Sequence, residues 1–153
     1  MAIVSAICNS FKQEILVEGH NFTNGTDAFK LALFTSSATL SKSTTAYTAP
    51  TDGTAAPTST HEVSSTSTGY TTGGNALTST TPVLSGDTAC CKFADTSFTS
   101  ASFTARGCLI YNSTNANKAV CAINFGADKT VTSGTFTIQF PAQTAGNAII
   151  QIA

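Results

Sequence analysis

The clearest alternation of hydrophobic and polar positions lies in residues 103–140. Near its end, Phe136, Ile138 and Phe140 alternate with Thr and Gln. Successive side chains of a strand point to opposite faces, so this pattern predicts a half-buried strand over residues 135–140. Pro141 follows at once and has no backbone N–H for a sheet, which sets the end of the strand.

Two further apolar runs precede it, at residues 103–111 and 118–125. The polar cluster at 112–117 carries Asn and Ser side chains that satisfy a turning backbone, and residues 126–129 interrupt the chain again. We therefore expect three antiparallel strands in a meander.

The first run places Leu109 and Tyr111 on one face, and Cys108 and Ile110 on the other together with Arg106. A buried unpaired charge costs several kcal/mol, so Arg106 is expected to reach water or a hydrogen-bonding partner.

The remaining chain is read in the same way. Residues 10–18 predict a short helix, with Ser10 as N-cap and Gly19 as its stop. Residues 27–34 predict a strand with one face in the core. Residues 35–69 are mostly Ser, Thr, Ala and Pro and predict a long loop, anchored in its second half by Tyr47 and Val63.

The C-terminal part adds more β-structure. Residues 70–77 predict a tight turn feeding a strand, and residues 88–93 another strand. Residues 147–153 end in β-branched side chains, which is typical of a segment held in a sheet.

The amino-acid composition limits the classes of function that the protein can have. The 153 residues fit a single domain, 1–153, with 41% hydrophobic but only 10% charged residues and a net charge of −1. Scattered Lys and Arg argue against nucleic acid as a partner. No apolar run is long enough for a membrane span, and the N-terminus lacks the basic region of a signal peptide.

The charges are also unevenly placed. Residues 64–85 and 130–153 carry none. Because surfaces normally carry charges for solubility, these stretches are expected to be buried in the core or against another chain.

Five cysteines, an odd number without C-x-x-C spacing, predict free thiols in a protein made in the cytosol. Cys91, Cys108 and Cys121 are expected to act as small core residues. Cys90 and Cys91 are adjacent, so on a strand they point to opposite faces and do not pair.

The sequence gives little indication of catalysis, and we predict no catalytic, cofactor-binding or metal-binding residue. His20 is interpreted as a turn residue, and His61-Glu62 as a surface pair on a strand edge, because a metal site needs three or four ligands. Gly73-Gly74 is read as a hairpin turn rather than a phosphate cradle. Three Asn-x-Thr/Ser sequons, beginning at Asn21, Asn24 and Asn112, are attributed to chance in a Thr-rich chain.

Several segments resemble small virion proteins of tailed bacteriophages. They are SFKQEIL, TDAFKLALFTSSATL, EVSSTSTGYTTGGNAL, SFTARGCLIYN, NKAVCAINFGADKTVTSGTFTIQFPA and AIIQIA. The resemblance implies a capsid cement or decoration protein, a β-sandwich that coats the assembled head as an oligomer. The cysteines at 90, 91, 108 and 121 depart from the aliphatic or aromatic residues expected there and leave their redox state open.

The expected fold is all-β, an antiparallel sandwich of jelly-roll type with seven or eight short strands and one N-terminal helix. As a cement protein it would bind the major capsid protein and its own copies on the capsid surface. Alternatives are a tail, collar or fibre component, or a glycan-binding adhesin using the loop at 35–69 with Tyr47, Asp52 and Tyr70.

Overall fold

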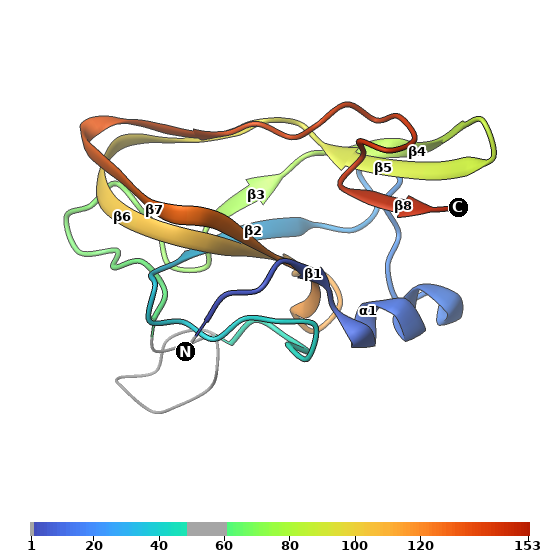
Figure 1. Ribbon diagram of the computed structural model, residues 1–153, viewed down its shortest axis with the longest axis horizontal. Helices are drawn as coiled ribbons and strands as arrows, with labels where there is room; N and C mark the ends of the chain where they lie inside the picture. The colour runs from blue at the N-terminus through green and yellow to red at the C-terminus, as the bar shows by residue number, and fades with distance from the viewer. Residues whose placement is uncertain (1, 49–60) are drawn as a thin grey trace.

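The computed structural model describes residues 2–48 and 61–153, which form two antiparallel sheets and one short helix (Figure 1). The five-stranded sheet has the order β1-β7-β6-β2-β3 and the three-stranded sheet the order β4-β5-β8. The strands are β1 (Ala6–Ile7), β2 (Phe29–Phe34), β3 (Asn75–Leu77), β4 (Ser79–Ser85), β5 (Thr88–Phe93), β6 (Thr96–Asn112), β7 (Lys118–Ile138) and β8 (Ile150–Ile152). The predicted β-rich class with one N-terminal helix is confirmed.

The helix is α1 (Asn9–Glu14), continued by the 3₁₀ turn η1 (Ile15–Val17). Cys8, not Ser10, occupies the N-cap position, and Glu18 rather than Gly19 takes the left-handed conformation at the end, with φ 58°. Gly19 is needed for space: a Cβ there would lie 2.8 Å from the Glu14 carbonyl oxygen. The helix was predicted correctly and ends before Gly19 as expected, but Ser10 is not its N-cap.

The predicted three-stranded meander is wrong. The runs at 118–125 and 135–140 belong largely to one strand, β7, which pairs with β6 from Asn112↔Lys118 to Thr96↔Ile138. The cluster at 126–129 does not reverse the chain. It is an irregularity in the ladder, between Gly107↔Asn124 and Ala105↔Lys129, because extra residues on one strand can bulge while both flanks stay paired.

These irregularities allow the long hairpin to bend. Figure 1 shows β6 and β7 curving at the left and returning to the right, so that the hairpin contributes to both layers of the molecule. Positive φ angles at Ser100, Gly126 and Ser133 lie along the curved part. The turn predicted at 112–117 is confirmed, since the Asn112 Oδ1 accepts hydrogen bonds from the backbone N–H groups of Thr114 and Asn115, both at 3.1 Å.

Strand β2 is buried on both faces, not on the one face predicted. Only Lys30 remains half-buried. On the face of Ala32 and Phe34, the adjoining Tyr111 of β6 stacks on Tyr47 with ring centroids 4.4 Å apart. The irregular chain after β2 therefore supplies a cover that strand periodicity does not reveal. Burial of Tyr47 and Val63 confirms them as the anchors of this segment.

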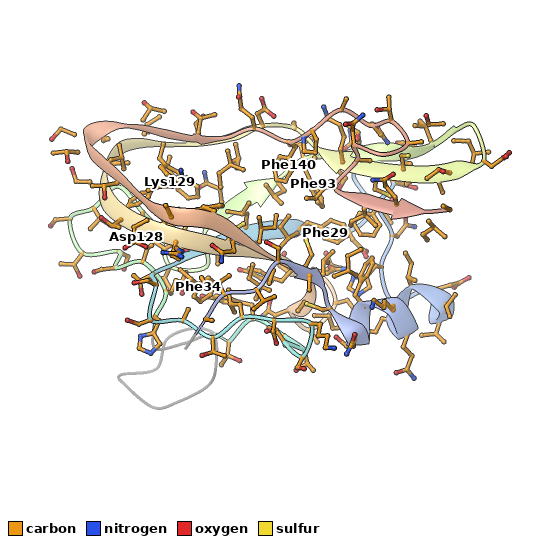
Figure 2. All side chains as sticks on the ribbon, viewed as in Figure 1. Phe29, Phe34, Phe93, Asp128, Lys129 and Phe140 are labelled. Atoms are coloured by element: carbon orange, nitrogen blue, oxygen red, sulfur yellow. The ribbon has the colours of Figure 1, made fainter. Side chains whose placement is uncertain are left out.

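The other predicted strands are divided between the two sheets: β5 and β8 lie in the three-stranded sheet and β3 at the edge of the five-stranded one. Residues 88–93 form β5 as expected, and the C-terminal β8 pairs with it through Ala89↔Ile152 and Cys91↔Ile150. The turn at 70–77 leads into β3, with Gly73 and Gly74 both at positive φ. Phe93 of the three-stranded sheet packs on Phe29 and Phe140 between the layers, with centroids 5.5 and 5.6 Å away (Figure 2).

Strand polarity near the end of β7 follows the predicted alternation: Thr137 is exposed, Ile138 is half-buried and Phe140 is buried. We expect Ile138→Asp to destabilise the protein by about 2 kcal/mol more than Thr137→Asp, because only the former places a charge among apolar side chains. Denaturant unfolding of both variants measures the difference. Equal stabilities would contradict the register of this strand.

Candidate functional site

Glu62 is the centre of a tyrosine network. Its Oε1 accepts hydrogen bonds from the Tyr70 hydroxyl at 2.6 Å and the Gly73 N–H at 2.7 Å, and its Oε2 accepts one from the Tyr47 hydroxyl at 2.9 Å. The Tyr111 hydroxyl donates to the Gly73 carbonyl at 2.8 Å. The prediction of a surface His61-Glu62 pair is therefore wrong for Glu62. Its carboxylate joins three parts of the irregular chain between β2 and β3, because it accepts hydrogen bonds from Tyr47, Tyr70 and Gly73.

All three tyrosines have a pKa above the ordinary value. Burial is the largest cause for each of Tyr47, Tyr70 and Tyr111, and the negative charge of Glu62 adds to it. Neutral hydroxyls are donors, whereas tyrosinates would repel the carboxylate. The three tyrosine hydroxyls therefore stay protonated and act as hydrogen-bond donors in this network.

An alkaline titration checks this. Unfolded tyrosine titrates near pH 10 and the folded tyrosines higher. The unfolded chain then loses protons first, so the stabilisation is complete below about pH 10 and declines as the pH rises further. We expect tyrosinate absorbance to appear together with loss of the circular dichroism signal. Tyrosinate forming near pH 10 in a folded chain would contradict the network.

His20 is buried rather than a simple turn residue. Its Nε2 lies 2.8 Å from Glu14 Oε2, and its Nδ1 lies 3.2 Å from Asn112 Nδ2, which also donates to Asp27 Oδ2 at 2.7 Å. The two backbone N–H groups bound to Asn112 Oδ1 fix that amide, so His20 Nδ1 accepts and its Nε2–H donates to Glu14. The cluster joins the helix to the hairpin tip. It could not be predicted from the sequence, because a single histidine without a surrounding motif does not indicate its partners.

All five cysteines are buried and none is bonded to another. Burial raises the pKa of Cys8 to about 11, with a further contribution from Glu14, and that of Cys121 to about 12. Burial also raises the pKa of Cys91 and Cys108. Thiols with raised pKa are poor nucleophiles, which fits a packing role.

We expect intact mass measured without reductant to match five thiols, and a thiol reagent to label the folded protein far more slowly than the unfolded one. The reason is that all five thiols are buried, and that the raised pKa of Cys8, Cys91, Cys108 and Cys121 suppresses their reactive thiolate form. A mass lower by two hydrogens per bridge, or a retained zinc ion, would contradict this.

The structure supports no binding or catalytic role for the other candidate residues of the sequence. In residues 2–48 and 61–153, His, Cys, Asp and Glu do not gather in groups of three that could hold a metal. Asn112 has no exposed surface, so this sequon is inaccessible in the folded chain. Arg106 has the partners expected for a mid-strand arginine: Asn124 Oδ1 at 3.3 Å and Asp128 Oδ1 at 3.4 Å.

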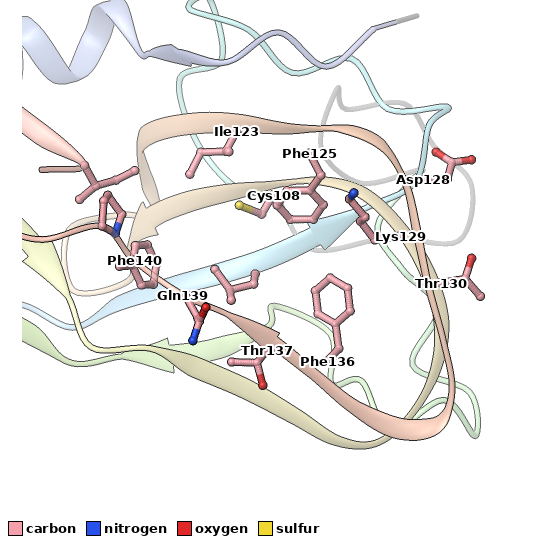
Figure 3. A pocket seen from close by; sticks show the side chains of 13 residues that line it. Cys108, Ile123, Phe125, Asp128, Lys129, Thr130, Phe136, Thr137, Gln139 and Phe140 are labelled. Carbon is pink, nitrogen blue, oxygen red and sulfur yellow. The ribbon is translucent and has the colours of Figure 1, made fainter. Parts of the chain in front are cut away.

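The bend of the hairpin borders a cavity of about 690 Å³ that is open to solvent (Figure 3). We call it the β7 hollow. Figure 3 shows Lys129 turned into it, whereas Asp128 and Thr130 point away. Its apolar lining consists of Cys108, Ile123, Phe125, Phe136, Ile138, Phe140, Pro141 and Ile149.

A second depression, which we call the η1 groove, has a volume of about 800 Å³ and lies between η1 and the three-stranded sheet. Its lining is mixed and includes the acidic side chains of Glu18 and Asp27. Ile15, Phe22, Ala89 and Ile152 are among its lining residues. Leu84 pairs with Ala89, which pairs with Ile152, so these three form one row across the sheet. Four of the strongly exposed large hydrophobic side chains lie in these elements: Leu16 (83%), Val17 (70%), Leu84 (75%) and Ile152 (56%).

Comparison of the chain with protein-family models, curated protein sequences and solved structures finds no match. In the part of the chain that the structure describes, no helix is long and apolar enough to cross a membrane. Function must therefore be argued from the surfaces themselves.

Proposed function

We propose that this protein is a structural virion protein of a tailed bacteriophage, a capsid cement protein that binds the outer surface of the head. The observation that carries the proposal is the apolar row of Leu84, Ala89 and Ile152 beside the η1 groove, in which Leu84 and Ile152 are exposed on charge-free strands. Exposed apolar surface of this kind is typical of protein-binding sites. The jelly-roll topology expected from the sequence is part of the same proposal.

The proposed mode of action follows from the fact that the polar groups of the two clusters are already engaged in hydrogen bonds. The groups around Glu62 and His20 are engaged in internal hydrogen bonds, so we assign the contact to the exposed apolar side chains of Leu84 and Ile152. Such a surface holds neighbouring capsid subunits together by buried area and backbone or hydroxyl hydrogen bonds.

Binding of the purified protein to undecorated heads tests the proposal. Leu84→Lys should weaken binding about tenfold or more, since it puts a charge into the contact. Val83→Lys is the matched control, because Val83 lies on the opposite face of β4 and is itself 46% exposed. Binding by the parent should change little with ionic strength, as screening acts on charges. Absence of binding to heads would overturn the proposal.

A tail, collar or fibre component uses the same kind of surface and is the second candidate. Copy number separates the two, since hundreds of copies per particle indicate cement and a dozen or fewer indicate tail or collar. The structure disfavours a glycan-binding adhesin, because Tyr47 and Tyr70 are buried with their hydroxyls bound to Glu62 and offer no open aromatic platform. Asp52, the third residue of that hypothesis, lies outside the described residues.

A further inference from the structure

The β7 hollow exposes side chains that belong in a core. Ile123 and Phe125 on one side and Phe136 and Ile138 on the other are only half-buried, although all four pack against the hydrophobic core. Phe125 and Phe136 face each other with ring centroids 6.2 Å apart. The sandwich is therefore open along this side, and its interior is in contact with water.

The same side presents an unpaired strand edge. Strand β1 pairs with β7 only at Cys121 and Ala122, and in the described chain no other strand lies along β7 opposite β6. From residue 126 to residue 138, the outer backbone groups of β7 thus lack a strand partner. A long edge of this kind is a template for another strand.

We propose that a second copy of this chain covers the β7 hollow, with the two β7 edges meeting across a twofold axis. A two-fold contact requires one surface to complement itself. This edge supplies apolar side chains, backbone donors and acceptors, and the adjacent charges of Asp128 and Lys129. Lys129 has no ion-pair partner among the described residues, and Asp128 has only the 3.4 Å contact with Arg106 at its half-exposed carboxylate.

The inference rests on the proposed function, because a dimer carries two η1 grooves with their apolar rows and thereby joins two capsid subunits. It assigns different tasks to two surfaces: the β7 hollow binds the other copy, and the η1 groove with its apolar row binds the head. Variants of each surface therefore have separable effects.

Sedimentation of the full chain tests the dimer. We expect a dimer at micromolar concentration that weakens somewhat at high ionic strength, because salt screens the charges of Asp128 and Lys129. Phe136→Lys should raise the dimer dissociation constant about 100-fold or more, since two like charges then meet in the contact. Thr135→Lys, at an exposed position on the opposite face of the same strand and outside the lining of the hollow, should leave the dimer intact, as should Leu84→Lys. Hydrogen exchange adds a readout without mutation: amides between 126 and 138 should be protected in a concentration-dependent manner.

The outcomes are distinct. If Phe136→Lys fails to fold, Phe125→Lys on the facing wall and the exchange experiment decide. A monomeric parent, unprotected edge amides, or dissociation by Leu84→Lys instead of Phe136→Lys would overturn the inference. A parent that dimerises in this way but does not bind heads would overturn the proposed function and leave the dimer standing.

Discussion

Replacing Gly74 by alanine should destabilise the protein by about 4 kcal/mol or more, lowering the melting temperature by roughly 10 °C. Gly74 has φ 75°, and a Cβ at this position would lie 1.7 Å from the carbonyl oxygen of Leu31 in the middle of β2. The obstacle is backbone of a central strand, which has little freedom to shift. Thermal and denaturant unfolding measure the loss.

Gly86→Ala is the matched control. Gly86 also has positive φ, 62°, but has no atom within 4 Å of the added Cβ. Its substitution should cost only the strain of a left-handed alanine, about 1 kcal/mol. If the two variants lost the same stability, the close crossing of the 71–74 turn over β2 would be wrong.

The second large effect is expected for Glu62→Ala, a loss of about 3 kcal/mol or more. Removing the carboxylate leaves the Tyr47 and Tyr70 hydroxyls and the Gly73 N–H without their acceptor, and hydrogen bonds to a charged group contribute about 1.5–3 kcal/mol each. Glu62→Gln should cost less, because its amide oxygen still accepts two of the three bonds. Urea unfolding compares the two variants.

Glu18→Gln serves as the control for loss of a negative charge, since Glu18 is exposed. It should change stability by less than about 0.5 kcal/mol. The network also predicts a spectroscopic change. In Glu62→Gln the negative charge that repels a tyrosinate is absent, so tyrosine ionisation should begin at a lower pH than in the parent. A loss for Glu62→Ala no larger than that for Glu18→Gln would show that the network contributes nothing to stability.

Local sequence patterns were sufficient to predict much of the β-structure. Strand periodicity identified the inward face of Phe136, Ile138 and Phe140, and the polar cluster at 112–117 identified the hairpin tip, because both depend on neighbouring residues. The need for a partner at Arg106 followed from the cost of a buried charge. The charge-poor composition indicated large neutral surfaces, and the structure leaves much of residues 130–153 exposed.

Tertiary structure alone decided that 118–138 is one bent strand, because a bulge and a turn use the same Gly and polar residues and differ only in where the flanks pair. It likewise decided that Glu62 meets two tyrosines and that His20 meets Glu14 and Asn112, since these partners converge through the fold and share no local motif. The β7 hollow has the same origin. Its walls come from distant parts of the hairpin, and only the curvature of the sheet brings them together.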